Sequence, residues 1–142
     1  MSIYADTSFL VSTCILDVHT PEANRRMSLR AVVWITDFNR VEVANALSRY
    51  VYKGRITPAQ AQTVWSNFEQ DVTQGVWMMV GMPRDVWQAG IELAWQFGPT
   101  FGVRTLDSLH VACALELGAK RFWTFDERQA RVAEAAGLDT NA

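Results

Sequence analysis

The sequence predicts an α/β protein, a three-layer α/β/α sandwich with a central parallel sheet. Short β-prone apolar segments alternate along the chain with longer segments in which apolar residues recur at helical spacing. Strands separated by helices need crossover connections, which make the strands parallel and cover both faces of the sheet. The chain has 142 residues, the size of one domain, and no repeat or linker divides it, so we expect a single domain over residues 1–142.

Four short apolar segments are the predicted strands. They cover residues 2–5, 32–35, 76–80 and 121–125. The third segment, VWMMV, lies between Gly75 and Gly81 and is too short to form a helix of its own. Continuous apolar runs of this length are typical of strands that are buried on both faces, as the central layer of a sandwich requires.

Helices are predicted between the strands, and two of them carry clear start signals. Thr20-Pro21 and Thr57-Pro58 each place an N-cap hydroxyl before a proline at the first helical position. After Thr57 the apolar residues recur every three or four positions. The predicted helices cover one or two segments up to residue 31, then residues 38–53, 57–72, 84–97 and 105–117, and a last segment that ends before Gly137.

The composition, 49% hydrophobic and 20% charged, is that of an ordinary soluble globular protein. No apolar run approaches the ~20 residues that cross a bilayer, and the N-terminus lacks a signal-peptide pattern, so we expect a cytoplasmic protein without membrane contact. Cys14 and Cys113 lie in apolar helical patterns and outside any zinc-ligand grouping, which indicates reduced core residues. The net charge of -2 argues against a strongly basic surface that grips duplex nucleic acid.

Carboxylates follow two of the predicted strands directly. Asp6 ends the first strand in SIYADTSFL, and Asp126 ends the last in FWTFDERQA. Two further acids lie in the early turns of predicted helices, Glu42 in RVEVANAL and Asp107 in TLDSLHVACAL. Ligands of open parallel sheets bind outside the carboxyl ends of the strands, and clustered carboxylates need a cation to offset their repulsion. These acids therefore predict a site for a hard divalent cation, Mg²⁺ or Mn²⁺.

Around these acids the sequence resembles the PIN-domain ribonucleases, and among them the VapC-type toxins of prokaryotic toxin–antitoxin systems. The similarity runs through ADTSFL, RVEVANALSRYVYKGRIT, RTLDSLHVACALELGA and RFWTFDERQARVAEAAGL, in the order and spacing of the family. Residues 11–29 and 76–100 fit the pattern only loosely. The resemblance implies a PIN-like fold, endoribonuclease activity on an RNA substrate, a homodimer, and inhibition by a cognate antitoxin.

The resemblance also implies roles for individual residues. It makes Asp6, Glu42, Asp107 and Asp126 the catalytic, metal-binding acids. It makes the hydroxyls of Thr7, Ser8 and Thr124 groups that orient the carboxylates or a metal-bound water. Phosphodiester cleavage agrees with such a site, because divalent ions held by carboxylates acidify a water and stabilise charge on the leaving oxygen.

Each of these residues has a structural interpretation as well. Asp126 is well placed to cap the last helix, and Glu42 competes with Asp37, which follows the second strand. His110, three residues after Asp107, is either a metal ligand or a buried, hydrogen-bonded residue, and the hard donor set favours the second. The family pattern around EVANAL favours Glu42 over Asp37.

Basic and aromatic residues offer two possible RNA contacts. Arg40 and Arg104 stand just before Glu42 and Asp107, and are either phosphate contacts or solvated arginines. The six tryptophans are expected in the core or at a dimer surface rather than as platforms for unpaired bases.

Three other functions remain open. One is a PIN-like nuclease of RNA processing, or a DNA nuclease, outside toxin–antitoxin systems. Another is a phosphoacceptor receiver domain, which also gathers acids at strand ends, although hydroxyls rather than a second acid follow Asp6. The last is a non-catalytic binding module, which the loss of one of the four acids would indicate, and all four are present.

Overall fold

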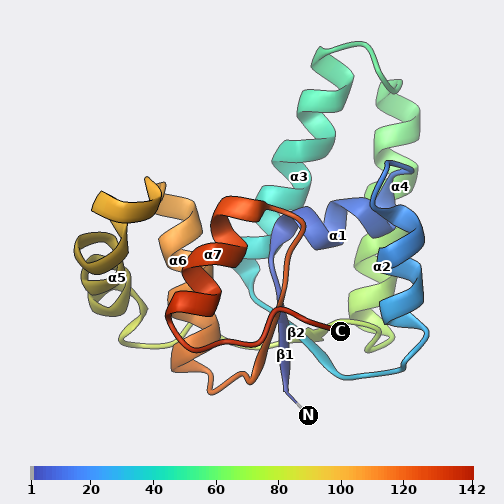
Figure 1. Ribbon diagram of the computed structural model, residues 1–142. Coiled ribbons are helices and arrows are strands. Elements are labelled where there is room, and N and C mark those ends of the chain that lie inside the picture. The colour runs from blue at the N-terminus through green and yellow to red at the C-terminus, as the bar shows by residue number, and fades with distance from the viewer. Residues whose placement is uncertain (1) are drawn as a thin grey trace.

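The protein folds around a four-stranded parallel sheet with the strand order β3-β2-β1-β4 (Figure 1). The structure, a computed structural model, describes residues 2–142, so Met1 of the predicted domain lies outside the described residues. The strands are β1 (Ile3–Ala5), β2 (Val33–Ile35), β3 (Met78–Met79) and β4 (Arg121–Trp123). The predicted central parallel sheet is thus confirmed.

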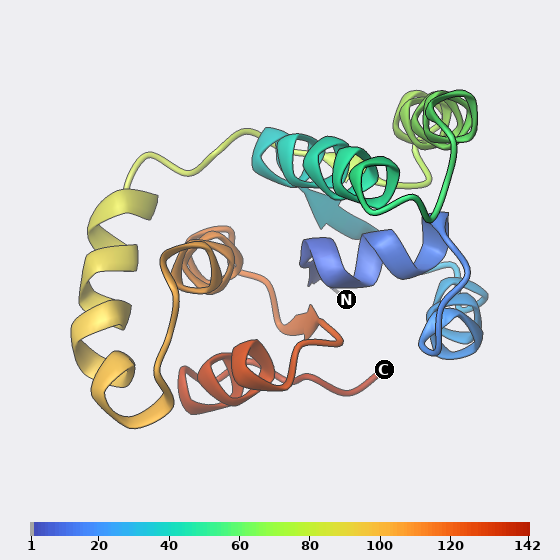
Figure 2. The ribbon, with the colours of Figure 1, turned by 90° about the horizontal axis from the view of Figure 1, so that it is seen from above.

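Helices connect the strands and flank the sheet on both sides. They are α1 (Thr7–Cys14), α2 (Thr20–Met27), α3 (Asp37–Tyr52), α4 (Pro58–Thr73), α5 (Val86–Phe101), α6 (Thr105–Glu116) and α7 (Glu127–Ala135). Seen from above, α1 to α4 lie on one side of the sheet and α5 to α7 on the other (Figure 2). The fold is therefore the predicted three-layer α/β/α sandwich, in the arrangement that right-handed crossovers produce between parallel strands.

Successive side chains of each strand point to opposite faces of the sheet, so the core has two halves, one on each face. Ile3 and Ala5 of β1 and Trp123 of β4 face α1 to α4, whereas Tyr4 and Phe122 face α5 to α7. All five side chains are buried, as expected for the central strands of a sheet covered on both faces. The two cores hold β1 rigidly, and β1 is the strand that leads into Asp6.

Several predicted boundaries are wrong by a few residues. β3 is only Met78–Met79 rather than 76–80, because it lies at the sheet edge and pairs with β2 alone. β4 ends at Trp123 rather than at residue 125, since the next residues leave the sheet to begin α7. α5 continues beyond residue 97 through Pro99 and ends at Phe101, and the φ of 65° at the next residue, Gly102, gives the left-handed cap that glycine adopts readily.

The predicted cap at Thr20 is also wrong, although the one at Thr57 is confirmed. The hydroxyl of Thr57 accepts a hydrogen bond from the backbone N–H of Gln60. The N-cap position of α2 is instead His19, and Thr20 is the first helical residue. The Thr20 hydroxyl accepts from the backbone N–H of Asp17 and donates to a carbonyl of α1, so it fixes the turn before the helix.

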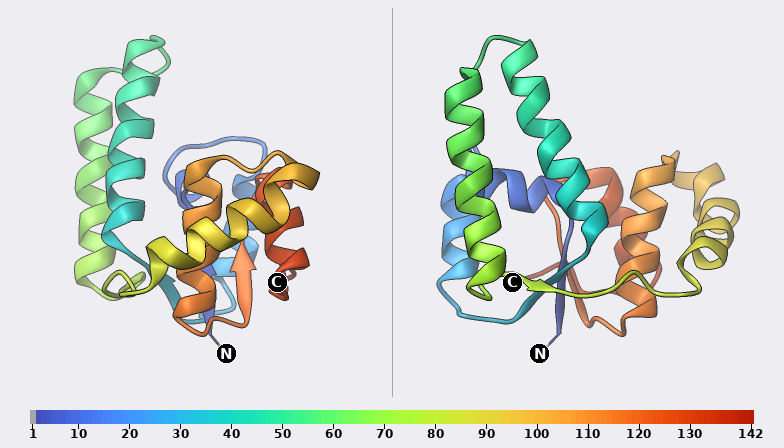
Figure 3. Two further views of the ribbon diagram at one scale, coloured as in Figure 1. Left: turned by 90° about the vertical axis from the view of Figure 1, so that its left-hand side faces the viewer. Right: turned by 180° about the vertical axis from the view of Figure 1, so that it is seen from behind.

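Helices α3 and α4 form an arm that projects beyond the sheet (Figure 3). At the base of this arm the guanidinium of Arg40 forms ion pairs with Asp37 and Glu69, and it lies over the ring of Trp65. At the tip Tyr52 is 89% exposed. α3 therefore runs without interruption from the edge of the sheet, where Glu42 lies, to a solvent-exposed tip.

Both cysteine thiols are free, Cys113 buried and Cys14 half-buried. Burial raises the pKa of each thiol to about 11, so both stay protonated and packed against the cores as predicted. Over residues 2–142, no helix is long and apolar enough to cross a membrane.

Candidate active site

Asp6 is a buried carboxylate at the point where β1 passes into α1. Its backbone N–H donates to the carbonyl of Trp123 in β4 (3.0 Å), and its side chain caps α1 by accepting from the N–H of Phe9 (3.0 Å). The hydroxyls of Ser8 (2.7 Å) and Thr124 (2.6 Å) also donate to it. Ser8 and Thr124 thus each hold one oxygen of this carboxylate.

Glu42 lies in the second turn of α3 and faces the start of α1. Its carboxylate accepts a hydrogen bond from the hydroxyl of Thr7 (2.7 Å), the third hydroxyl predicted at the site. It also accepts from Nε2 of His110, which reaches it from α6. Glu42 is half-buried, and two donors from two different helices fix the position of its carboxylate.

The two carboxyls have opposite electrostatics. Burial raises the pKa of Asp6 above its ordinary value, and the neighbouring His110 and the hydrogen bonds to the carboxylate only partly offset this. Burial acts on Glu42 in the same direction, but the hydrogen bond and charge of His110 together with the Thr7 hydroxyl hold the pKa of Glu42 below its ordinary value. Of these two carboxyls, Asp6 is the one whose ionised form a nearby cation would help more.

His110 is a buried residue that connects Glu42 to the core. A carboxylate only accepts, so Nε2 carries the hydrogen that faces Glu42. Nδ1 lies 2.8 Å from the hydroxyl of Tyr4, which in turn lies 3.3 Å from Oδ1 of Asn39 in α3. The imidazole also stacks on Phe38 with 4.4 Å between ring centroids. These contacts agree with the buried, hydrogen-bonded interpretation of this histidine.

Asp107 and Asp126 share one cationic partner. Nε of Arg104 donates to Asp107 (3.0 Å), and its terminal nitrogen donates to Asp126 (3.2 Å). Gln129 of α7 links the same pair, because its side-chain amide donates to Asp107 (3.2 Å) and its backbone N–H donates to Asp126 (3.0 Å). Asp126 therefore caps α7, as its structural interpretation predicted, and it also shares Arg104 with Asp107.

Arg40 was the other arginine predicted to contact RNA, and Asp37 was the acid that competed with Glu42. These two residues form an ion pair with each other. Asp37 is exposed in the first turn of α3 and pairs with Arg40. Arg40 is held between Asp37 and Glu69, and within residues 2–142 it forms no ion pair with the four candidate acids. Of the two acids of α3 weighed for the site, Glu42 is the one that contacts the residues around Asp6.

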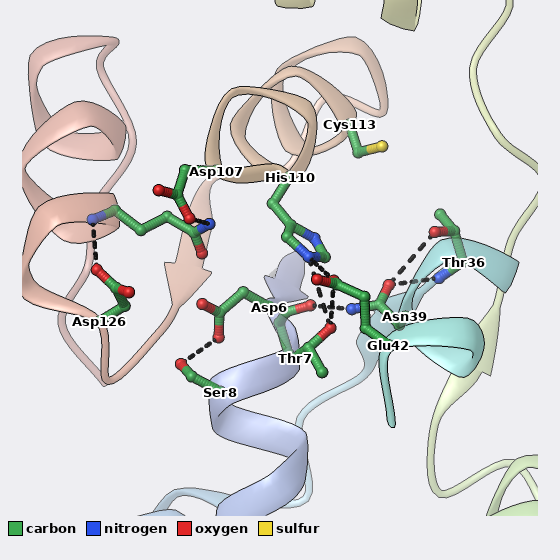
Figure 4. Close-up of polar contacts among 12 residues, drawn as sticks. Asp6, Thr7, Ser8, Thr36, Asn39, Glu42, Asp107, His110, Cys113 and Asp126 are labelled. Carbon is green, nitrogen blue, oxygen red and sulfur yellow. Dashed lines mark hydrogen bonds and ion pairs between the residues drawn. The ribbon is translucent and has the colours of Figure 1, made fainter. Parts of the chain in front are cut away.

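The four acids lie at the end of the sheet where β1 and β4 finish. Asp6 is between Glu42 and the Asp107–Asp126 pair (Figure 4). In the part of the chain that the structure describes, no three acid, histidine or cysteine side chains already converge closely enough to hold a metal ion. The donors still fit a hard cation chemically, since all are carboxylate or hydroxyl oxygens. The guanidinium of Arg104 supplies part of the positive charge that a metal would bring.

Sequence reasoning missed two polar residues that hold the site together. Gln129 is buried within α7, three residues after Asp126, which is the position that a capping residue contacts. Asn39 is buried three residues after Thr36 and accepts from its backbone N–H (2.9 Å). The spacing from a capping residue was the available signal in both cases. Tyr4 offered no such signal, because a tyrosine within an apolar strand reads as core.

A parallel α/β/α sandwich with carboxylates at the carboxyl ends of its strands defines a class of proteins that bind ligands at the sheet edge. The family model of the PIN domain matches residues 3–135, and the chain therefore belongs to the PIN domain family. The resemblance seen in the sequence is confirmed at this level. Among curated protein sequences, none is significantly similar to this chain.

Solved structures with the same fold include toxin–antitoxin proteins. VapC20 of Mycobacterium tuberculosis, described as a toxin that cleaves the sarcin-ricin loop, is 19% identical with a TM-score of 0.71, over 96% of this chain and 95% of that one. VapBC2 of Rickettsia felis, solved with a DNA fragment from its promoter, is 15% identical with a TM-score of 0.72, over 99% and 98%. FitAcB of Neisseria gonorrhoeae is 12% identical with a TM-score of 0.73, over 98% and 96%. At these identities the likeness concerns the fold.

Proposed function

We propose that this protein is a Mg²⁺- or Mn²⁺-dependent endoribonuclease and the toxin of a toxin–antitoxin pair. The observation that carries the proposal is the row of carboxylates at the sheet edge, centred on a buried Asp6 whose pKa is raised. A buried carboxylate with a perturbed pKa beside other charged groups is typical of a functional site. The PIN fold and the structural likeness to VapC toxins support the reaction and its biological role.

The chain's own residues would act by position and charge. Asp6, Glu42, Asp107 and Asp126 would hold the cation, which supplies an acidified water and neutralises charge on the phosphodiester. Ser8 and Thr124 fix both oxygens of Asp6 from two segments of the chain. His110 and Thr7 both donate to one oxygen of Glu42, Oε1, and fix that carboxylate from two helices. Such rigid placement before substrate arrives is what lowers the barrier of a metal-assisted hydrolysis.

Single-stranded or looped RNA is the proposed substrate. An A-form duplex hides its bases in a deep groove, whereas a loop can bring its backbone into a cleft at the edge of a sheet. The small net charge of -2 also favours a short contact over the long basic surface that duplex binding needs. The protein would act in the cytoplasm, where its RNA substrates are found.

The function is tested by cleavage of a single-stranded RNA in Mn²⁺ or Mg²⁺ and in EDTA. We expect cleavage only with the metal, and loss of cleavage in Asp6→Asn. Asp37→Asn is the matched control, because Asp37 is an exposed acid of α3 that pairs with Arg40 outside the site. Undiminished cleavage in EDTA by protein free of contaminating nuclease would refute the metal mechanism. Equal loss of cleavage in Asp6→Asn and Asp37→Asn would refute the assignment of the site.

A cognate antitoxin is the proposed protein partner. Two of the similar structures, VapBC2 and FitAcB, carry paired names that describe complexes of this kind. We propose that the antitoxin covers the acidic edge and excludes RNA from it. Co-expression with the product of a neighbouring small gene, followed by purification and a cleavage assay, tests this. A stable complex that cuts RNA at the rate of the free protein contradicts it.

A second copy of this chain is the other proposed partner, bound through the outer face of α5. Trp87, Ile91 and Trp95 stand one turn apart on that helix, and they are 62%, 52% and 80% exposed. Trp87 and Ile91 also line a groove between α5 and α6, to which Leu109 of α6 and Val103 of the connecting segment contribute. Two exposed tryptophans on one helix face are unusual outside interfaces, and the aligned faces of two copies would bury them.

A further inference from the structure

An open groove lies next to Asp126, on the outer side of the candidate site. It has a volume of about 460 Å³ and lies between the residue that precedes α6 and the first turns of α7. Its lining residues are Arg104, Asp126, Glu127, Arg128 and Arg131. The groove therefore adjoins the four acids at Asp126. Arg104 lines the groove and also pairs with two of those acids.

Two of the three arginines that line this groove have no ion-pair partner within residues 2–142. The charge of Arg104 is already shared between two carboxylates of the candidate site. Arg128 and Arg131 are exposed, and neither forms an ion pair with any residue from 2 to 142. They stand three positions apart on α7, so both guanidinium groups project from the same face of the helix. Glu127 precedes Arg128 and Glu134 lies three positions after Arg131, and within residues 2–142 neither acid forms an ion pair with these arginines.

A bound anion would offset the charges of Arg128 and Arg131. The planar guanidinium donates two parallel hydrogen bonds to phosphate oxygens, a geometry that lysine does not offer. Arg128 lies in the first turn of α7, where the helix dipole also favours a negative charge. Asp126 and Glu127 are the acids that line the groove, and the carboxylate of Asp126 is already engaged by the helix cap and by Arg104.

We propose that Arg128 and Arg131 bind a backbone phosphate of the RNA strand, a neighbour of the phosphodiester that lies at the acids. The proposal rests on the proposed function, because it assigns the anion to the substrate of that site. It explains how an acidic site retains a polyanion: the cation would offset the acids at the point of cleavage, and the two arginines would hold the strand beside it. The contact is to the backbone, so it gives affinity and register rather than base preference.

Equilibrium binding of a fluorescent single-stranded RNA oligonucleotide, measured by anisotropy in EDTA at several salt concentrations, tests the groove without cleavage. The variants are Arg128→Gln, Arg131→Gln and the pair together. Arg84→Gln is the matched control, since Arg84 is exposed, forms no ion pair within residues 2–142, and lies at the opposite end of α5 from Arg104. The substituted side chains are exposed, so melting temperatures should match the unmodified protein.

We expect the double variant to bind RNA about tenfold or more weakly. The slope of log affinity against log salt should fall by about 0.7 for each phosphate that the arginines no longer neutralise. Arg84→Gln should change neither quantity. Unchanged affinity and slope in the double variant overturn the proposal, and so does an equally weakened affinity in Arg84→Gln, which would indicate a general effect of charge.

The outcome is separable from that of the proposed function. If metal-dependent cleavage occurs but binding is indifferent to Arg128 and Arg131, the groove proposal fails and the nuclease stands. If RNA binding depends on the two arginines but no cleavage is found in Mn²⁺ or Mg²⁺, the nuclease fails and the groove remains an RNA-binding site. The binding assay contains no metal, so the two results are obtained independently.

Discussion

The imidazole of His110 holds the carboxylate of Glu42 from within the protein. The two residues belong to α6 and α3, which lie on opposite sides of the sheet, and their hydrogen bond passes over the carboxyl end of β1. Tyr4 of β1 supports the imidazole from below (2.8 Å). The position of one candidate metal ligand thus depends on a residue that is not itself one of the four acids.

We expect His110→Phe to weaken metal binding, because phenylalanine keeps the stacking on Phe38 but offers Glu42 no donor. Removing this partner should cost about 1–3 kcal/mol of unfolding free energy in EDTA. His110→Gln, whose amide nitrogen can still donate to Glu42, should retain more of the metal affinity and more of the unfolding free energy. Mn²⁺ titration and urea unfolding measure the two effects. Wild-type Mn²⁺ affinity in His110→Phe would show that the imidazole has no positioning role.

Thr124→Val should destabilise the protein in a pH-dependent manner. The hydroxyl of Thr124 donates to Asp6 (2.6 Å), so its loss raises the pKa of Asp6 further above the unfolded value. For an acid whose folded pKa is raised, ionisation costs more in the folded state, and protonation at low pH relieves that cost. The mutant's deficit in unfolding free energy should therefore be full at neutral pH and shrink as pH falls through the folded pKa.

The measurement for Thr124→Val is urea unfolding in EDTA at several pH values, with Thr63→Val as the control. Thr63 is exposed, and its hydroxyl donates to a carbonyl of its own helix. We expect no pH-dependent difference in that control. A deficit of the same size at every pH would mean that the Thr124 hydroxyl acts on packing and not on the ionised form of Asp6.

Asp107→Asn should separate catalysis from stability. Asp107 is paired with Arg104 and accepts from Gln129, so its repulsion with the other acids is already offset in the metal-free protein. Because the guanidinium is largely exposed, loss of the ion pair should change the unfolding free energy by less than about 1 kcal/mol. Cleavage and Mn²⁺ affinity should fall sharply, since a neutral amide is a weaker ligand.

Melting curves with and without Mn²⁺, beside an RNA cleavage assay, test Asp107→Asn. We expect Mn²⁺ to raise the melting temperature of the unmodified protein more than that of the variant. A variant that melts lower in EDTA yet cuts RNA at the full rate would assign Asp107 to structure alone.

Trp95→Glu should convert a dimer to a monomer if α5 forms the interface. The side chain is 80% exposed, so the change should leave the fold of one subunit intact. Tyr52→Glu is the control, because Tyr52 is 89% exposed at the tip of the α3–α4 arm. Sedimentation velocity at micromolar concentrations measures the mass. A monomeric unmodified protein, or a Trp95→Glu dimer, would contradict an interface on this face.

The sequence allowed the fold and the positions of the acids to be predicted because both depend on local patterns. Asp6 and Asp126 follow apolar strands, and parallel strands carry such residues to one edge. The contacts that orient these acids were not predictable in the same way. Arg104 reaches Asp126 across 22 positions, and Tyr4 reaches His110 across 106. Side chains that meet only after folding leave no periodicity or spacing in the chain.

The pairing of β1 with β4 has a consequence for the order in which the protein is made. Ile3 is in register with Arg121, and the hydrogen bond from Thr124 to Asp6 joins residues 118 positions apart. Contacts over such separations form late, because the whole intervening chain must first be ordered or looped out. A polypeptide still growing on the ribosome has β1 without this neighbour and Asp6 without its hydroxyl donor. The ability to cut RNA would therefore begin only after translation has passed Asp126.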